Sequence, residues 1–96
     1  MKMVLIMYSM SIDEEVMESL KDVGVKEYTK WVGVHGKGTA SGAHLDSDIW
    51  PGANNVLGIA LENDKVSEVL SKIRELRKKL GKEGVKGFII PLEEIT

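Results

Sequence analysis

The residues best suited to chemistry gather in one stretch near the middle of the chain, residues 33–55, which holds both histidines and five of the ten glycines. His44, Asp46 and Asp48 occupy alternate positions, so their side chains would point to the same side of an extended segment. One imidazole and two carboxylates form a donor set that suits a divalent transition metal, and His35 would supply a fourth ligand. The alternative is that these polar side chains are simply solvated in an exposed loop.

The same stretch ends in Trp50-Pro51-Gly52, a sequence typical of a turn, because proline presets φ and glycine accepts the left-handed position. Trp50 either packs beneath the loop as its anchor or contacts a ligand or a partner protein. Asn54 is expected to close the turn rather than to bind a substrate. A connection of this length inside a small domain is uncommon and is typical of a functional loop.

The length and composition predict one ordinary globular domain that covers residues 1–96. The net charge of −2 gives no general attraction to nucleic acid, and the absence of cysteine excludes disulfides, thiolate metal sites and a cysteine nucleophile. No run approaches the ~20 apolar residues that cross a bilayer, and the apolar start of the chain is better explained as a buried strand than as a signal peptide. We therefore expect a cytoplasmic protein that neither enters membranes nor binds nucleic acid.

Catalysis finds little support in the sequence. Serine, histidine and aspartate all occur in residues 33–55, but no pattern there pairs a nucleophile with a base and an orienting acid. Glu14 and Glu15 are explained by the start of a helix, where the helix dipole favours negative charge. The sequence predicts a binding protein rather than an enzyme.

The elements that must position this middle stretch repeat one scheme in each half of the chain. Ser11 and Glu14 form a capping-box pattern before one amphipathic helix, and a second amphipathic helix runs to Leu80. Strands are predicted at residues 3–8, 25–34, 56–61 and 88–90. The order β-α-β-β-α-β predicts a ferredoxin-like α+β sandwich, in which a four-stranded antiparallel sheet carries two helices on one face. We expect other subunits to cover the bare sheet face, including Trp31.

Four stretches, in this order and spacing, resemble the PII signal-transduction family, and the similarity extends over nearly the whole chain. They are a carboxylate-rich helix start, a helix end followed by Gly-Val, a strand entering a loop through Gly-x-Gly, and a glycine-lysine turn with its closing strand: residues 12–16, 22–25, 34–38 and 81–95. The terminal run Phe-Ile-Ile-Pro-Leu-Glu-Glu-Ile is the most specific. The chain has no C-terminal arginine pair and no tyrosine in residues 33–55, so it is similar to a divergent, PII-like member.

The resemblance implies a homotrimer with three nucleotide clefts between subunits. It also implies that the middle loop changes shape with a small anionic ligand, an adenine nucleotide such as ATP or ADP, and docks on a target protein. Glycine-rich turns bind anions through backbone N–H groups, and a lysine adds a mobile charge. Carried over to this sequence, the ligand-binding residues are Gly36, Lys37 and Gly38 at the loop base and Lys82, Gly84 and Lys86 from the second turn.

Two other functions remain open on the residues alone. A metal-binding or metal-responsive trimer, of the CutA-like type that shares this architecture, would use His35, His44, Asp46 and Asp48 to hold a divalent metal. A purely structural subunit would use residues 33–55 only to lock the trimer, with Trp50 as the anchor.

Overall fold

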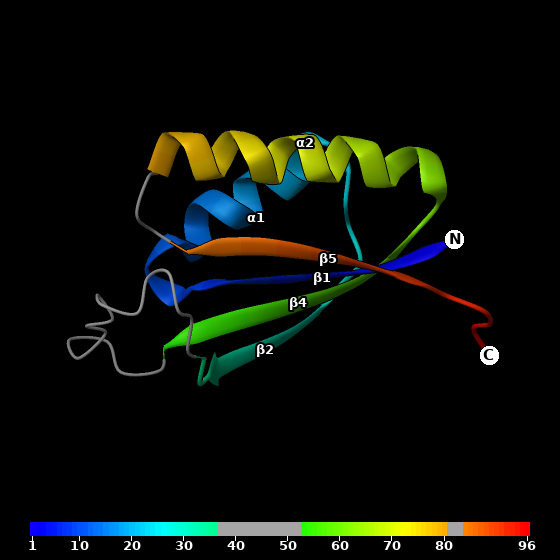
Figure 1. Ribbon diagram of the computed structural model, residues 1–96, viewed down its shortest axis with the longest axis horizontal. Coiled ribbons are helices and arrows are strands. Elements are labelled where there is room, and N and C mark those ends of the chain that lie inside the picture. The colour runs from blue at the N-terminus through cyan, green and yellow to red at the C-terminus, as the bar shows by residue number, and fades with distance from the viewer. Residues whose placement is uncertain (37–52, 81–83) are drawn as a thin grey trace.

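The computed structural model describes residues 1–36, 53–80 and 84–96. In chain order the elements are β1 (Lys2–Ser9), the 3-10 helix η1 (Met10–Ile12), α1 (Asp13–Asp22), β2 (Thr29–Val34), β4 (Asn54–Leu61), α2 (Asn63–Leu80) and β5 (Val85–Pro91). The described strands form one four-stranded sheet in the order β2-β4-β1-β5, and every neighbouring pair is antiparallel. Both α-helices lie over the same face of the sheet (Figure 1). The predicted ferredoxin-like α+β sandwich is confirmed.

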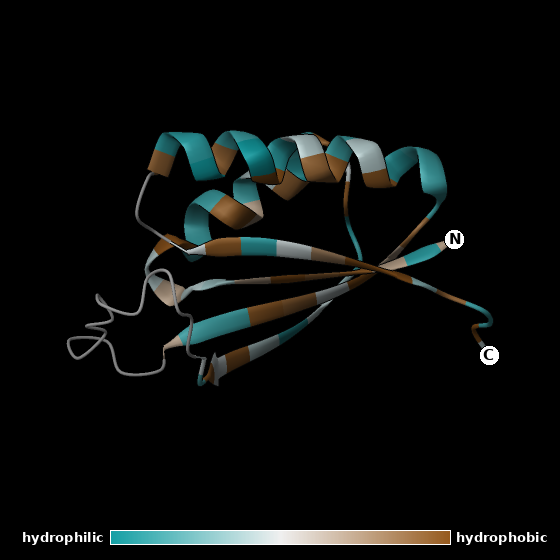
Figure 2. Ribbon diagram, in the orientation of Figure 1, coloured by the Kyte–Doolittle hydropathy of each residue, from teal (hydrophilic) through white to brown (hydrophobic). Residues whose placement is uncertain are grey.

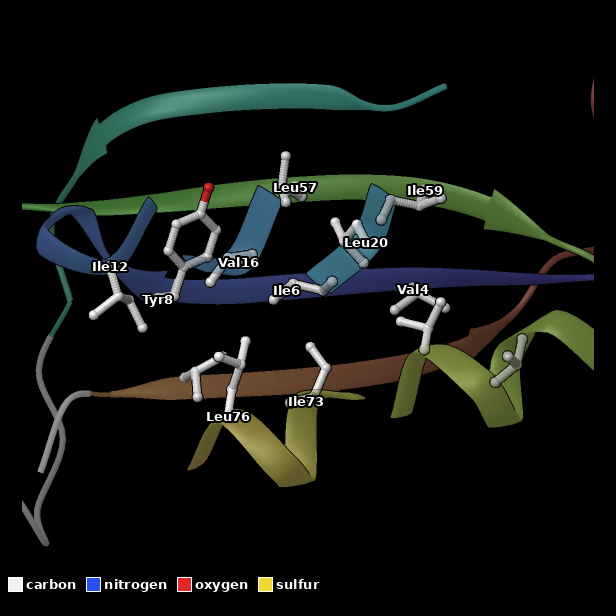
Figure 3. Close-up of a cluster of buried hydrophobic side chains, with 13 residues drawn as sticks. Val4, Ile6, Tyr8, Ile12, Val16, Leu20, Leu57, Ile59, Ile73 and Leu76 are labelled. Carbon is white, nitrogen blue, oxygen red and sulfur yellow. The ribbon is translucent and has the colours of Figure 1, made fainter. Parts of the chain in front are cut away.

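The hydrophobic core lies between the helices and the sheet, with β1 as a central strand. Along β1, Val4, Ile6 and Tyr8 point toward the helices and are buried, as the period of two in a strand requires. Each helix is apolar along one side only, and that side faces the sheet (Figure 2). The buried helix residues are Val16, Leu20, Val66, Val69, Ile73 and Leu76. They interdigitate with the β1 and β4 side chains that Figure 3 shows.

Several element boundaries differ from the sequence predictions. The α-helix begins at Asp13, later than the capping-box pattern predicts, because a 3-10 turn capped by the Ser9 side chain comes first. Ile12 is then the N-cap residue of α1, and it makes no side-chain cap hydrogen bond. β2 begins only at Thr29, where its pairing with β4 begins. The last strand is longer than predicted, Val85–Pro91, because it pairs with β1 along its whole length.

The sheet face turned away from the helices is apolar and exposed in the single chain. Cross-strand partners point to the same side of a sheet, so Leu5 and its partner Phe88 share this face. Trp31, Phe88 and Ile90 are 49%, 43% and 43% exposed. The Trp31 ring lies so close to Gly58 that a Cβ there would stand 3.1 Å from Trp31 Cζ3. Among the described residues, no helix is long and apolar enough to cross a membrane.

Candidate ligand-binding site at one end of the sheet

Gly36 and Gly84, the described residues of the predicted anion-binding turns, lie at the same end of the sheet. β2 ends there, and β4 and β5 both begin there (Figure 1). The end of β1 ties these segments together: the Ser9 N–H donates to the Gly84 carbonyl at 3.1 Å, and the Met10 N–H donates to the Ala53 carbonyl at 3.0 Å. Two consecutive residues therefore hold the edge of the second turn and the return from the middle segment.

The loop base is closely packed at Gly36. A Cβ at this position would lie 3.0 Å from the amide nitrogen of Asn54, which is the first residue of β4. Any side chain at residue 36 would therefore displace the Asn54 amide. His35 and Gly36 are both exposed, so their backbone groups are accessible to a ligand in the single chain.

The second turn reaches this end through β5. Gly84 is exposed, and no atom lies within 4 Å of where its Cβ would stand. Lys86 is paired with Met7 and so projects onto the exposed apolar face rather than toward the helices. Arg77 on α2 fixes the start of the strand, because its Nε and Nη2 donate to the Val85 carbonyl at 3.2 and 3.1 Å. Gly84 and Lys86 therefore lie where the sheet end meets its open face.

Several predicted residues lie outside the described part of the chain. They are Lys37, Gly38 and Lys82 of the predicted anion site, His44, Asp46 and Asp48 of the predicted metal site, and Trp50 and Pro51 of the predicted anchor. His35 is the predicted metal ligand that the structure does describe. Within residues 1–36, 53–80 and 84–96, no three His, Asp or Glu side chains are grouped so as to hold a metal ion. The metal site therefore stays a prediction.

A polar cluster that the sequence analysis did not predict joins three strands to the start of α1. The Asp13 carboxylate accepts hydrogen bonds from the Tyr8 hydroxyl at 2.5 Å and from Asn55 Nδ2 at 3.2 Å. Lys30 Nζ donates to the two Asp13 oxygens at 2.9 and 3.1 Å. Asn55 is 3% exposed, whereas the Lys30 and Asp13 side chains are 22% and 37% exposed. Figure 3 shows the Tyr8 ring within the core and its hydroxyl over β4. We call these four residues the Asp13 cluster.

The electrostatics of the Asp13 cluster favour one charge state. Burial by itself raises the pKa of the Asp13 carboxyl, but the hydrogen bonds from Tyr8, Lys30 and Asn55 outweigh burial and hold this pKa below its usual range. Burial and then the hydrogen bond to Asp13 raise the pKa of Tyr8 well above its usual value. At neutral pH the cluster therefore contains an ionised carboxylate and a protonated tyrosine.

Beside the cluster, β2 carries a bulge. Val32 pairs with Asn55 and Val34 pairs with Asn54, so Gly33 is an extra residue with no partner across the ladder. Gly33 has a φ of 74°, a left-handed conformation that favours glycine. Its N–H donates to Asn55 Oδ1 at 3.3 Å. A glycine between β-branched residues is a recognisable bulge signal in the sequence, whereas nothing local to residue 55 shows that its side chain completes the bulge.

Two shallow hollows on the described surface lie on other parts of the molecule. One lies between the helices, where Lys72 Nζ stands 3.9 Å from the Asp22 carboxylate, and the other lies beside Gly24 and Leu61. Neither is lined by a residue of the Asp13 cluster or of the two turns. A ligand at the sheet end would therefore gain nothing from these hollows.

Comparison with known proteins agrees with this architecture. The model of the family described as Nitrogen regulatory protein P-II matches residues 1–96. The chain belongs to the P-II family. Members of this family are regulatory signalling proteins and are generally not enzymes, so the chain is a PII-like regulatory protein. No curated protein sequence matches the chain.

Solved structures share the fold of this P-II family protein. CPII, a nitrogen regulatory PII-like protein from Thiomonas intermedia K12, bound to ADP, AMP and bicarbonate, is 19% identical with a TM-score of 0.68; the match covers 99% of this chain and 94% of CPII. A putative PII-like signalling protein from Thermus thermophilus is 22% identical with a TM-score of 0.65, over 92% of this chain and 82% of that protein. The apo form of CPII matches with 21% identity and a TM-score of 0.66, over 93% of this chain and 87% of that one.

Proposed function

We propose that this P-II family protein is a cytoplasmic homotrimer that binds a small anionic ligand, an adenine nucleotide, between its subunits. The observation that carries the proposal is that Gly36 and Gly84 lie at one end of the sheet, where the Ser9 N–H donates to the Gly84 carbonyl and Gly36 packs on Asn54. Backbone N–H groups of such turns bind phosphate oxygens, and Lys86, two residues after Gly84, would add a positive charge. The ADP and AMP bound to CPII support the choice of nucleotide.

The open face of the sheet supports the homotrimer. Large apolar side chains such as Trp31, Phe88 and Ile90 remain more than two-fifths exposed in the single chain. Burying such surface stabilises an assembly by about 25 cal/mol per Å². Lys86 projects onto the same face of the sheet, so subunits that assemble through this face would have Lys86 at their boundary. The nucleotide would then be held between the turns of one subunit and the surface of the next.

The middle segment is proposed to report the ligand to a target protein. Residues 37–52 follow Gly36 directly in the chain, so a ligand at the loop base would contact the start of this segment. A ligand that favours one arrangement of the segment shifts its population by the difference in binding free energy between arrangements. A target protein that docks on the favoured arrangement would then sense nucleotide occupancy.

The proposal is tested by measuring mass and nucleotide affinity together. Light scattering should give three chains per particle, and calorimetry with ADP should give about one site per chain, since a closed symmetric ring repeats its interface once per subunit. Lys86→Ala should weaken ADP binding by roughly tenfold or more, the size expected for loss of a charge-assisted phosphate contact. The matched control is Lys78→Ala, which removes an exposed lysine from the last turn of α2.

Two results would contradict the proposal separately. A trimer that produces no binding heat with millimolar ADP would show that the nucleotide assignment is wrong. Equal weakening by Lys86→Ala and Lys78→Ala would show that the effect is general electrostatic attraction and that Lys86 is not at the site.

A further inference from the structure

The Asp13 carboxylate makes more contacts than the start of a helix requires. A negative charge in the first turn of α1 needs no partner, because the helix dipole already favours it. Asp13 nevertheless binds Tyr8 of β1, Lys30 of β2 and Asn55 of β4. These strands are neighbours in the sheet, in the order β2-β4-β1. One side chain therefore fixes the relative positions of α1 and three adjacent strands at the loop end.

From Asp13 the contacts continue to the loop base. The Asn55 side chain donates to Asp13 through Nδ2 and accepts the Gly33 N–H through Oδ1, so one buried amide joins α1 to the bulge. The bulge leaves the Gly33 N–H outside the β2–β4 ladder, and without Asn55 this donor would lose its partner. The bulge also decides which way His35 and Gly36 leave the sheet, because an extra residue changes the alternation of the strand.

We infer that Asp13 and Asn55 are positioning residues, which hold the Gly33 bulge and thereby set the orientation of the ligand-binding loop base at His35 and Gly36. The identity of the ligand in this inference rests on the proposed function, whereas the contacts of Asp13 and Asn55 do not. According to the inference, neither Asp13 nor Asn55 contacts the ligand. Asp13 acts by fixing the amide of Asn55, and Asn55 acts by fixing the backbone of Gly33.

The experiment compares two cluster variants with a matched control. Asp13→Asn replaces the carboxylate opposite Lys30 by a neutral amide, which brings a hydrogen-bond donor to a place where Tyr8, Lys30 and Asn55 already donate. Asn55→Ala removes the acceptor of the Gly33 N–H. The control is Asp22→Asn, the same substitution at the exposed end of the same helix, where the nearest lysine nitrogen, Lys72 Nζ, is 3.9 Å away. Amide hydrogen exchange is followed by NMR on the trimer, and ADP affinity is measured by calorimetry well below each melting temperature.

If the inference is right, exchange of the Gly33 amide should accelerate roughly tenfold in both cluster variants, as expected for loss of its hydrogen bond to Asn55 Oδ1. Amides in the middle of α2, such as Val69, should exchange as in the wild type. ADP affinity should fall in both variants by a similar factor, and Asp22→Asn should change neither measurement.

A uniform acceleration over all amides would overturn the inference, because it would mean that the cluster only stabilises the fold. Unchanged ADP affinity in variants of a wild type that binds ADP would overturn it as well. If the wild type itself binds no ADP, the proposed function fails, and exchange alone then decides the role of the cluster: selective acceleration at Gly33 supports it, and any other pattern refutes it.

Discussion

Replacing Gly58 by alanine should destabilise the protein when residue 31 is tryptophan and stabilise it when residue 31 is a smaller side chain. Gly58 lies in the middle of β4, and its φ is not in the left-handed region, so the backbone itself accepts alanine. The obstacle is the Trp31 ring: a new Cβ would stand 3.1 Å from Cζ3 and 3.3 Å from Cη2. Leu5 Cδ2, at 3.7 Å, is at an ordinary contact distance.

The magnitude follows from two opposing effects. Gly→Ala at a compatible position stabilises by about 0.4–1 kcal/mol, because it reduces the conformational entropy of the unfolded chain. Forcing an extra methyl into a packed contact costs about 1–3 kcal/mol. In the wild-type background we therefore expect Gly58→Ala to lower the free energy of unfolding by about 1–2 kcal/mol. In a Trp31→Val background, where the ring atoms are absent, the same substitution should raise it by about 0.4–1 kcal/mol.

The assay is a double-mutant cycle by urea unfolding, with all four proteins at one chain concentration because assembly contributes to stability. Light scattering on each variant checks that the oligomeric state is the same throughout the cycle. Equal destabilisation by Gly58→Ala in both backgrounds would refute the reasoning, because it would show that the Trp31 ring is not what makes residue 58 intolerant of a side chain.

Two further predictions concern polar contacts. The lowered pKa of Asp13 means that its ionised form adds stability above the unfolded carboxyl pKa of about 3.9 and that this contribution disappears as pH falls through the folded pKa. The stability gap between wild type and Asp13→Asn should therefore narrow as the pH falls below about 5 in urea titrations; a constant gap would contradict this. Lys65 Nζ donates to the Val23 carbonyl at 2.8 Å, so Lys65→Met should cost about 1 kcal/mol of unfolding free energy, and no loss would show that water replaces this contact fully.

The fold could be predicted from the sequence because the patterns that indicate helices and strands are local and periodic. The continuous apolar run of residues 3–8 predicts a buried strand, and apolar residues at every third or fourth position predict the two amphipathic helices. The order of these segments then restricts the topology to a few arrangements. The start of α1 was not predicted correctly, because the capping-box pattern at Ser11 does not show that a 3-10 turn precedes the helix at Asp13.

The candidate site could be predicted from the sequence only in part. Gly36 and Gly84 were chosen through resemblance to the PII family, and the structure brings them to one end of the sheet through Ser9 and Met10. The involvement of Asp13 was missed, since an acidic residue at a helix start has a sufficient local explanation in the helix dipole.

The sequence by itself determined the order of helices and strands, the buried faces of the helices and the resemblance to a family, because each depends on residue types at short, regular spacings. Only the tertiary structure decided that Asp13 forms one cluster with Lys30 and Asn55, which lie 17 and 42 residues from it in the chain. Contacts over such separations depend on strand order and register rather than on any local pattern. The β2–β4 register opposes Val32 to Asn55, and the bulge at Gly33 follows directly, so the Asn55 amide can bind both the Gly33 N–H and the Asp13 carboxylate.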